Sequence, residues 1–400
     1  MATHSLTTRL RPREFPTTGF EVIDPSQMYY PMRIGEIIQG RYQVVATLGY
    51  GVTSTVWLSR DLRDGKYWTL KVHINTLKHN EELLIYRQLA SIAATEEAIE
   101  EALGRDNVRR LEDSFKLEGP NGEDDVFVMT PLEMSLRTLQ QTQKSGIFPQ
   151  QFVTGALDQV LLGLVFLHEA GVVHTDLHSD NLLIALTNDA ILATVEENEI
   201  KEPSARKQVG DVIIHVSQYM LGGPGPLVIC DFGQARIGSQ HTGSAMPVPY
   251  RAPEVLINMP WGNAVDMWSV GLLAWNLLEP ESLFRVYDQE SEEQNVAHHL
   301  GAMTALLGPP PPEFLSRSQE TNKYWNADGQ WQGPVPLPPK KEFESLVKAL
   351  EGEDKENFIS LVECFLNWLP EERLPALQAY FHPWLRGERV EDFAARVGLS

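Results

Sequence analysis

The sequence is poor in cysteine, in positive charge and in long apolar runs. Its two cysteines, Cys230 and Cys364, lie in apolar stretches, so we expect no disulfide framework and a reducing compartment. No uncharged apolar segment reaches the roughly 18–20 residues that span a bilayer, so we expect no membrane contact. Thirty-three basic against fifty-four acidic residues give a net charge of −21, which argues against nucleic acid as a direct ligand. The acidic surface either serves solubility alone or attracts a basic peptide or protein.

Both ends of the chain are predicted to be tails. Residues 1–33 are polar and contain four prolines, which predicts a partly disordered extension whose Tyr29 and Tyr30 pack on the domain. Three arginines and no acid in the first thirteen residues are weakly similar to a transit peptide, but no amphipathic pattern accompanies them. Residues 386–400 are predicted to form a C-terminal tail.

The chain is organised around a polar loop, residues 174–181, which lies between the apolar pairs Val172-Val173 and Leu182-Leu183. We expect two short buried strands to hold this loop at both ends. Asp176 and Asn181 lie five residues apart in it. A carboxylate and a carboxamide at this spacing can accept a hydroxyl proton and hold a divalent cation.

A second polar motif, Asp231-Phe232-Gly233, follows the loop by fifty residues, after a predicted strand over residues 227–230. An apolar stretch over residues 156–167 precedes the loop and predicts a helix. Helices over residues 150–168 and 263–279 would supply the larger core.

Alternating residues predict a β-hairpin over residues 42–48 and 54–58. Two glycines at its tip allow the backbone to lie close over phosphates and donate N–H groups to them, although an ordinary hairpin turn fits the same residues. Ser54 stands where the usual G-x-G-x-x-G pattern has its third glycine. The tip consists of Gly49, Tyr50, Gly51, Val52, Thr53 and Ser54.

A single lysine, Lys71, interrupts the apolar strand predicted over residues 67–72. A buried lysine needs a partner, and Glu82 can supply one from the inner face of a helix predicted over residues 80–89. The alternative is a surface lysine and a solvated glutamate.

A strand over residues 126–129 leads into Thr130-Pro131-Leu132, which we interpret as a hinge between a small β-rich lobe and a larger helical one. The Thr130 carbonyl and the Leu132 N–H would bind an adenine edge. Pro131 has no N–H, and none is needed there.

Seven features occur together in the order of one family. They are the glycine tip, Lys71, Glu82, the loop 174–181, residues 231–233, Ala252-Pro253-Glu254, and the run 266–271 with Arg373. On these residues the chain resembles the eukaryotic protein-kinase family from about residue 42 to 385. The resemblance implies an α+β, bilobal protein-kinase fold, with a small β-rich N-lobe that contains one main helix and a larger, mostly helical C-lobe.

The implied boundaries are an N-lobe at residues 34–129, the hinge at 130–132 and a C-lobe at 133–385. A short spacer-type insertion would occupy residues 188–226, and a second insert about 280–340. Glutamates 196, 197, 199 and 202 make a solvated loop the interpretation of the first insertion, although residues 212–216 could form a strand.

Within the family the chain is most similar to the SR-protein kinases of the CMGC group. The similarity rests on the sequence motif at residues 48–58, on Thr175 where most kinases have arginine, on the insertion between Asn181 and Asp231, and on residues 299–310. It implies basic Arg/Ser-rich protein substrates. It also implies activity without phosphorylation of the short activation segment, residues 234–251.

The resemblance implies ATP and Mg²⁺ as cofactors. Asp176 would accept the substrate's hydroxyl proton, Asn181 and Asp231 would hold Mg²⁺, and Lys71 would hold the α and β phosphates. The implied catalytic residues are Asp176, Lys71, Asn181 and His178. The implied nucleotide-binding residues are Leu48, Gly49, Tyr50, Gly51, Val52, Thr53, Ser54, Thr55, Val56, Lys71, Glu82, Met129, Thr130, Leu132 and Asp231.

Three further residues have implied supporting roles. Glu254 and Arg373 would form a buried ion pair, and Asp266 would support the catalytic loop. His178 departs from the family, which usually has lysine there, so a neutral imidazole and low but real turnover are predicted.

An acidic run at residues 288–293 either docks basic substrates or is a solvated loop. Two other functions stay open: a kinase-fold small-molecule phosphotransferase, whose loop also uses histidine, and an ATP-binding pseudokinase scaffold. We expect a monomer in the cytoplasm and nucleus.

Overall fold

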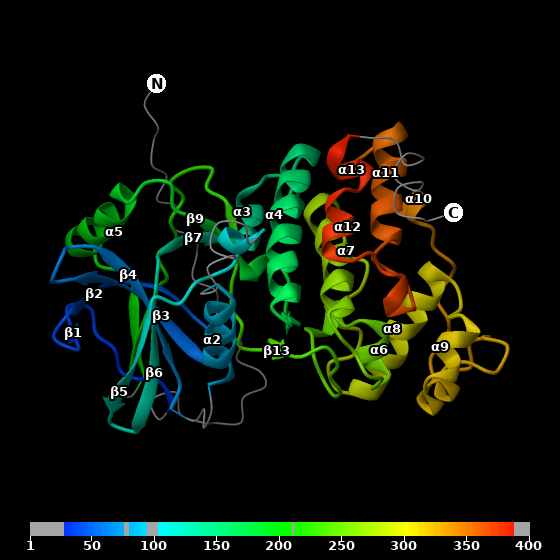
Figure 1. The fold of residues 1–400 in the computed structure, drawn as a ribbon, viewed down its shortest axis with the longest axis horizontal. Coiled ribbons are helices and arrows are strands. Elements are labelled where there is room, and N and C mark those ends of the chain that lie inside the picture. The colour runs from blue at the N-terminus through cyan, green and yellow to red at the C-terminus, as the bar shows by residue number, and fades with distance from the viewer. Residues whose placement is uncertain (1–27, 76–79, 94–102, 210–211, 388–400) are drawn as a thin grey trace. The chain divides into compact units, whose positions relative to one another are not determined.

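Two compact units make up the chain in the computed structural model, which describes residues 28–75, 80–93, 103–209 and 212–387 (Figure 1). Unit 1 comprises Met1–Asn80, Arg109–Met134 and Leu183–Pro226. Unit 2 comprises Glu81–Val108, Ser135–Leu182 and Leu227–Ser400. The contacts thus group the helix after Lys71 with unit 2, and the insertion at 188–226 with unit 1, whereas the sequence interpretation assigned them the other way round.

Unit 1 is built on a six-stranded sheet of order β1-β2-β3-β4-β6-β5. Every neighbouring pair in this sheet is antiparallel. The predicted hairpin is confirmed as β2 and β3, and its glycine tip comprises the end of β2, the turn at residues 51–53 and the first residue of β3. The strands are β1 (Ile37–Ile38), β2 (Tyr42–Tyr50), β3 (Ser54–Asp61), β4 (Tyr67–His73), β5 (Asp113–Gly119) and β6 (Gly122–Met129).

One face of this sheet carries a buried apolar cluster that includes Tyr42, Val44, Trp57, Leu70 and Val128. Alternation places these residues on one side, and the aromatic and β-branched side chains favour the pleated surface. The predicted packing of the N-terminal extension is confirmed for Tyr30, which contacts this cluster and donates a hydrogen bond to Glu36 Oε1 at 2.8 Å.

The interpretation of residues 188–226 as a solvated loop is wrong. They contain α5 (Ala190–Lys201) and a hairpin of β10 (Arg206–Val209) and β11 (Val212–His215), which confirms the strand expected near residue 212. The apolar face of α5 is buried on the sheet. It packs Ile191, Leu192 and Val195, together with Met220, against Val45, Ala46 and Leu58.

Polar contacts hold the rest of the insertion to the sheet and to the segment that follows the predicted hinge. Gln218 donates its N–H to the carbonyl of Thr47 at 2.8 Å, and Met134 donates to the carbonyl of Met220 at 3.0 Å. Gly222 donates to the buried Glu133 carboxylate at 2.8 Å. The predicted hinge residue Leu132 begins a strand, β7 (Leu132–Ser135), which lies beside β9 (Leu182–Ala185).

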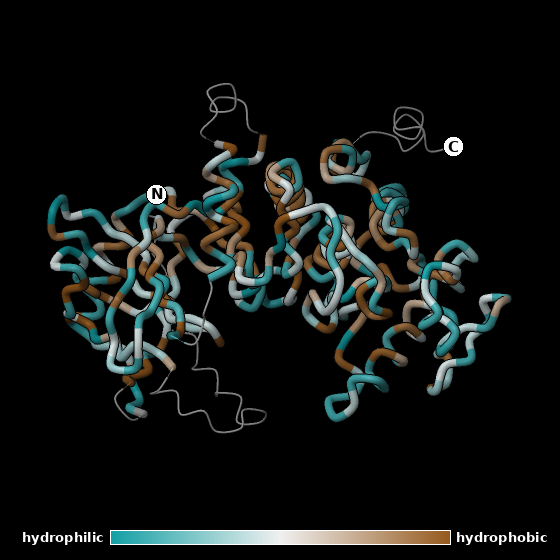
Figure 2. Tube along the Cα trace, turned by 60° about the horizontal axis from the view of Figure 1, so that its bottom comes forward, coloured by the Kyte–Doolittle hydropathy of each residue, from teal (hydrophilic) through white to brown (hydrophobic). Residues whose placement is uncertain are grey.

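Unit 2 is mostly helical and is centred on α4 (Gln150–Glu169) and α7 (Ala264–Leu278) (Figure 1). Thirteen residues of α7 are buried, as expected for a helix that is apolar on every side. By length and composition α4 could cross a membrane, but buried core helices pass the same test and 56% of its apolar window is buried. Hydrophobic and hydrophilic residues alternate along the helices, as expected for elements with one buried face (Figure 2).

The other helical elements of unit 2 surround this pair. They are α2 (Glu81–Ala93), α3 (Leu136–Thr142), α6 (Pro253–Leu256), α8 (Glu292–Leu307), α9 (Pro312–Ser316), α10 (Phe343–Leu346), α11 (Gly352–Glu363), α12 (Ala376–Tyr380) and α13 (Pro383–Arg386). The 3₁₀ turns are η1 (Arg105–Asn107), η2 (Ser179–Asn181), η3 (Val248–Tyr250), η4 (Gln319–Lys323) and η5 (Pro370–Glu372). The short strands are β8 (Val172–Val173), β12 (Leu227–Ile229) and β13 (Arg236–Ile237).

The predicted ion pair between Glu254 and Arg373 is confirmed. Two parallel hydrogen bonds of 2.7 Å join the guanidinium to the carboxylate. The Arg373 side chain is 0% exposed and the Glu254 side chain 1%. Arg373 also donates to the carbonyls of Ala264 and Asn367, and it lies over the ring of Trp268. This pair joins the first residues of α6 to the segment before α12.

Candidate active site

Asp266 fixes the start of the polar loop in unit 2. Its buried carboxylate accepts hydrogen bonds from the backbone N–H groups of His174 and Thr175, each at 2.8 Å, and it lies 2.9 Å from His168 Nε2. Because a buried carboxylate is costly without partners, these contacts hold the loop to α7. The prediction that Asp266 supports the loop from a helix is confirmed.

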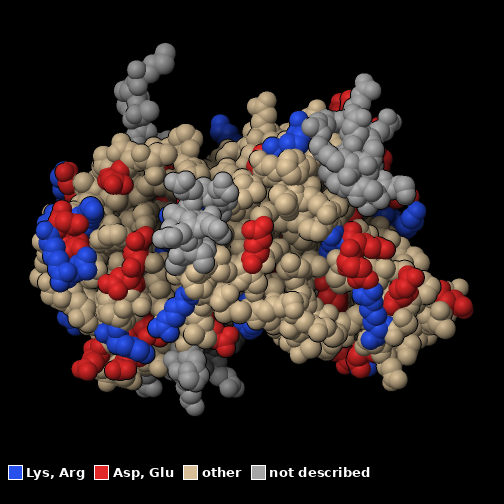
Figure 3. All heavy atoms as spheres, in the orientation of Figure 1, with Lys and Arg blue, Asp and Glu red and all other residues tan. Residues whose placement is uncertain are grey.

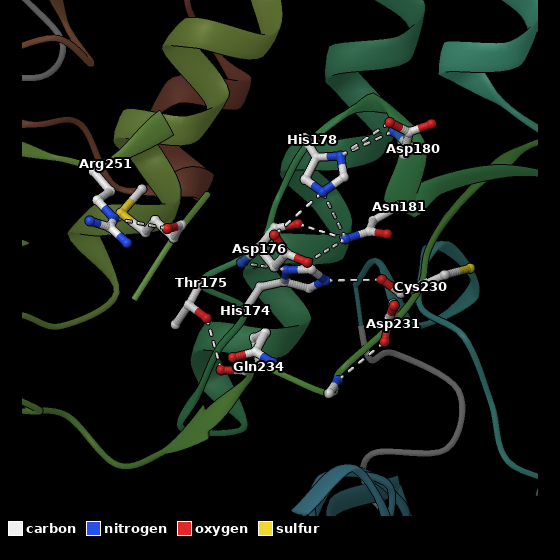
Figure 4. A network of polar contacts seen from close by, with 12 residues as sticks. His174, Thr175, Asp176, His178, Asp180, Asn181, Cys230, Asp231, Gln234 and Arg251 are labelled. Atoms are coloured by element: carbon white, nitrogen blue, oxygen red, sulfur yellow. Dashed lines mark hydrogen bonds and ion pairs between the residues drawn. The ribbon is translucent and has the colours of Figure 1, made fainter. Parts of the chain in front are cut away.

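The ring of His174 connects the loop to the Asp231-Phe232-Gly233 motif (Figure 4). Its Nδ1 accepts the N–H of Asp176 at 3.2 Å, so its proton lies on Nε2, which donates to the Cys230 carbonyl at 3.1 Å. Phe232 is fully buried and packs edge-on against His174 and against Tyr86 of α2, with ring centroids 5.5 and 5.3 Å apart. The predicted role of Cys230 as a small core residue agrees with its burial.

Asp176, His178 and Asn181 form one polar cluster (Figure 4). Asn181 Nδ2 donates to the Asp176 carbonyl at 2.8 Å and to Asp176 Oδ2 at 3.0 Å. His178 Nε2 lies 3.3 Å from Asp176 Oδ1, and the Asp176 side chain is 22% exposed. The structure thus brings together three of the four predicted catalytic residues, with a carboxylate that solvent or a ligand can reach.

His178 is more basic than an ordinary histidine. Burial lowers its pKa, but the hydrogen bond and charge of Asp176, with the charges of Asp180 and Asp231, outweigh that effect and raise the pKa overall. The neutral imidazole stays a prediction: the ring accepts the N–H of Asp180 on Nδ1 at 3.3 Å, as a neutral ring does, whereas the raised pKa favours the protonated form.

Thr175 takes up a contact that ties the loop to the segment after residue 233. It adopts a left-handed conformation with φ +65°, and its hydroxyl donates to the Gln234 carbonyl at 2.8 Å. Further along the segment, His241 exchanges two backbone hydrogen bonds with Trp261, at 2.8 and 2.9 Å. Trp261 Nε1 donates to the Gly243 carbonyl at 3.0 Å. Neutral hydrogen bonds therefore hold the segment at several points.

Asn181 and Asp231 lie on neighbouring chain segments, because the N–H of Cys230 donates to the Asn181 carbonyl at 2.8 Å. Asp231 has a left-handed φ of +65°, and its Oδ1 accepts the N–H of Gly233 at 3.3 Å. Asn181 uses its Nδ2 on Asp176, and within the described ranges its amide oxygen accepts no hydrogen bond. One amide oxygen and one exposed carboxylate suit Mg²⁺, which takes few protein ligands and completes its shell with water and phosphate oxygens.

The glycine tip lies in unit 1. Among the residues that the structure describes, a Cβ atom at Gly49 or Gly51 would meet no atom within 4 Å, and neither glycine has a positive φ. The fold therefore does not require glycine at either position, and the space above the tip is open to a ligand that needs close approach to the backbone.

Tyr29 is a contact of this tip that the sequence prediction did not identify. Its hydroxyl lies 2.9 Å from the carbonyl oxygens of Gly51 and Val52. The tyrosine pair at the end of the N-terminal extension indicated packing, but no pattern specified the partner.

The other predicted nucleotide-binding residues take different places. Lys71 is buried on β4, where it pairs across strands with Val56 and Phe127. Met129 is buried at the end of β6, and Thr130 after it is exposed. Further positions are as follows: Leu48 is partly buried against the α5 cluster, Tyr50, Val52 and Thr53 are exposed, Ser54 is buried, Thr55 is partly buried, and Glu82 is buried on α2 in unit 2.

Comparison with known proteins gives a consistent result. The protein kinase domain family matches residues 42–385. A serine/threonine protein kinase of Aspergillus fumigatus is 36% identical over 364 residues, which cover 90% of this chain and 88% of the relative. The serine/threonine-protein kinase SRPK of Physarum polycephalum is 27% identical, with 89% of this chain and 88% of the relative covered. The dual specificity protein kinase lkh1 of Schizosaccharomyces pombe is 24% identical over 92% of this chain and 50% of its own.

Proposed function

The chain belongs to the protein kinase domain family and is a protein serine/threonine kinase, and from this premise we propose that it phosphorylates serine in Arg/Ser-rich proteins without prior phosphorylation of its activation segment. The observation that carries the phosphoryl transfer in this proposal is the cluster of Asp176, His178 and Asn181 beside Asp231. The family uses ATP and a divalent metal ion, for which we propose Mg²⁺.

We propose a task for each residue of this cluster from its contacts in unit 2. Asp176 would accept the proton of the substrate hydroxyl, because its carboxylate is exposed and is held by Asn181 Nδ2. Asn181 Oδ1 and the Asp231 carboxylate would hold the metal ion. Once bound, the ion would neutralise charge on the phosphate oxygens. His178, with its raised pKa, would place a further positive charge beside the transferred phosphoryl group.

Unit 1 would hold the nucleotide. The open space above Gly49 and Gly51 suits phosphates that accept backbone N–H groups. A buried ammonium such as that of Lys71 needs anionic partners, and the α and β phosphates would supply them.

We expect Tyr29→Phe to raise the Michaelis constant for ATP by about two- to tenfold, because the phenylalanine loses the hydrogen bonds that restrain the glycine tip. Steady-state kinetics with varied ATP measures this effect. Tyr30→Phe is the matched control, since its hydroxyl contacts Glu36 instead. Equal Michaelis constants for wild type and Tyr29→Phe would remove Tyr29 from nucleotide binding.

The proposed substrate class rests on charge and on similarity. Acidic and basic side chains are interspersed over the face shown in Figure 3. Because the net charge of the whole chain is −21, its overall electrostatic field would still attract a basic peptide. The similarity to the Physarum kinase supports the same class. Two carboxylates of the acidic run at residues 288–293 already have partners within the protein, which leaves less negative charge for a basic substrate. Glu292 pairs with Arg251 at 3.1 Å, and Asp288 accepts two backbone N–H groups.

The contacts of residues 234–251 support activity without a phosphate. Thr175 cannot bind a phosphate as arginine does, and its hydroxyl instead holds the Gln234 carbonyl. Because neutral hydrogen bonds already fix the segment at His241 and Gly243, we expect phosphorylation to add little further order to this segment.

The test is phosphate transfer from ATP to an Arg-Ser repeat peptide by protein produced in bacteria and shown by mass spectrometry to be unphosphorylated. A Lys-rich peptide is the control substrate. A variant with alanine at Ser239, Thr242 and Ser244 removes the serine and threonine hydroxyls of the segment. We expect transfer to the Arg-Ser peptide at similar rates for both proteins. Activity that appears only after treatment with an upstream kinase would refute the proposal, and transfer to neither peptide despite Mg-ATP binding would favour a scaffold.

We expect the turnover number to fall as pH rises through the raised pKa of His178, because the protonated ring is the form that stabilises phosphate charge, and this form is present below the pKa. His178→Lys should raise turnover and move the fall to higher pH, since an unperturbed lysine titrates near about 10.4. The measurement is the pH profile of kcat at saturating substrates. Unchanged or lower turnover in His178→Lys would contradict this role.

A further inference from the structure

A pocket of about 330 Å³ opens within unit 2 beside the catalytic loop. The loop contributes His178, Ser179 and Asp180 to its wall. The remaining lining comes from Arg137 on α3, from Pro247, Pro249 and Tyr250, from Leu272 and Asn276 on α7, and from residues 282–286. Because His178 also lies 3.3 Å from Asp176, the pocket begins next to the residue that would receive the substrate hydroxyl.

Two arginines without a carboxylate partner line this pocket. Within the described part of the chain, neither Arg137 nor Arg285 makes an ion pair, and both are exposed. The arginines nearby along the chain differ, since Arg251, Arg317 and Arg373 each bind a glutamate. The protein as a whole carries a net charge of −21, so two arginines without an ion-pair partner make this pocket locally more positive than the chain as a whole.

The neutral groups of the pocket also suit an acceptor. Asn276 Nδ2 donates to the Tyr250 hydroxyl at 2.9 Å, so the hydroxyl proton of Tyr250 is left to donate to another group. Arg285 lies over the ring of Tyr287, which restrains its guanidinium from one side. Asp180 is the opposing charge in the lining, and its side chain is 50% exposed, so solvent screens it.

We propose that this pocket selects substrates with an acidic or phosphorylated side chain within about three residues of the acceptor serine or threonine, an inference that rests on the proposed kinase function. An extended peptide advances about 3.3 Å per residue, so a pocket next to Asp176 reaches only close neighbours of the acceptor. Guanidinium groups bind carboxylate and phosphate oxygens through paired N–H donors. A partly phosphorylated Arg/Ser repeat carries both the basic residues and the anion.

The test is a set of Arg-Ser peptides with a single acceptor serine, in which each position from three before to three after the acceptor is alanine, aspartate, phosphoserine or arginine. For each peptide kcat/KM is measured with wild type, with the double variant Arg137→Glu/Arg285→Glu and with Lys341→Glu. Lys341 is an exposed cation of unit 2 outside the pocket, so Lys341→Glu shows whether the same charge reversal at one site elsewhere has an effect. Equal melting temperatures would show that all three proteins are folded.

We expect one position at which the anion raises kcat/KM over alanine, and an about tenfold loss of that ratio in the double variant but not in Lys341→Glu. A gain from phosphoserine alone would identify a phosphate site, and a gain from aspartate as well would show that a carboxylate suffices. Transfer without any anion preference, or a preference for arginine that Asp180→Asn abolishes, would overturn this inference alone. No transfer to any peptide would overturn the proposed function together with it.

Discussion

Asp176→Asn is expected to lower the turnover number by about 10²–10⁴-fold, while binding of Mg-ATP changes little. The amide keeps the shape of the carboxylate but cannot take the proton of the substrate hydroxyl. It also replaces one of the two carboxylate oxygens with an N–H₂ group, which would face either Asn181 Nδ2, now 3.0 Å from Oδ2, or His178 Nε2, now 3.3 Å from Oδ1. The loop itself should remain in place, since Asp266 and His174 hold its backbone. Single-turnover kinetics with the Arg-Ser peptide, and calorimetry with Mg-ATP, separate the two effects.

The matched control for this substitution is Asp328→Asn, which makes the same chemical change at an exposed position in the second insert. It should retain wild-type turnover. If Asp176→Asn retained more than about a tenth of the wild-type rate, Asp176 would not be the general base, because loss of a positioned base costs more than this.

Arg373→Met is expected to destabilise the protein by about 3–5 kcal/mol, because it leaves the Glu254 carboxylate buried without its partner. The guanidinium also donates to the carbonyls of Ala264 and Asn367, which would lose these bonds as well. Thermal and denaturant unfolding measure the effect, provided that unfolding is reversible. The double variant Arg373→Met/Glu254→Met should be more stable than either single one, since it removes both charges.

An exposed pair supplies the comparison for this prediction. Arg317 binds Glu371, and the two side chains are 39% and 56% exposed. Arg317→Met should therefore cost no more than about 1 kcal/mol. If the Arg317 and Arg373 substitutions cost the same, burial would not be what makes the Glu254 pair important.

Much of the catalytic cluster could be predicted from sequence because its chemistry depends on short spacings. Asp176 and Asn181 share one loop, and the apolar pairs around the loop indicate its anchoring strands, which the structure has as β8 and β9. The Glu254–Arg373 pair spans 119 residues and was predictable only from the resemblance to a family.

The insertion shows what a charge pattern alone cannot resolve. Its glutamates suggested a solvated loop, yet Glu199 is buried and accepts hydrogen bonds from Ser204 and Gln218. Ile191 and Val195 have helical spacing, and this was the signal that could have predicted α5. Their burial depends on Val45, Ala46 and Leu58, which lie far away in the chain, so no local pattern could show it.

The contact between α5 and the sheet also sets an order of events during synthesis. Unit 1 is assembled from three separate chain segments. Val45 can be buried only after Val195 has been synthesised, about 150 residues later in the chain. At ribosomal speeds of about 5–20 residues per second, this delay lasts roughly 8–30 seconds. During that time Val45, Ala46 and Leu58 on the nascent β2 and β3 strands stay uncovered, which is the kind of surface that chaperones bind. The folding yield of this enzyme should therefore depend more on translation rate and chaperone supply than that of a chain whose sheet is completed by neighbouring residues.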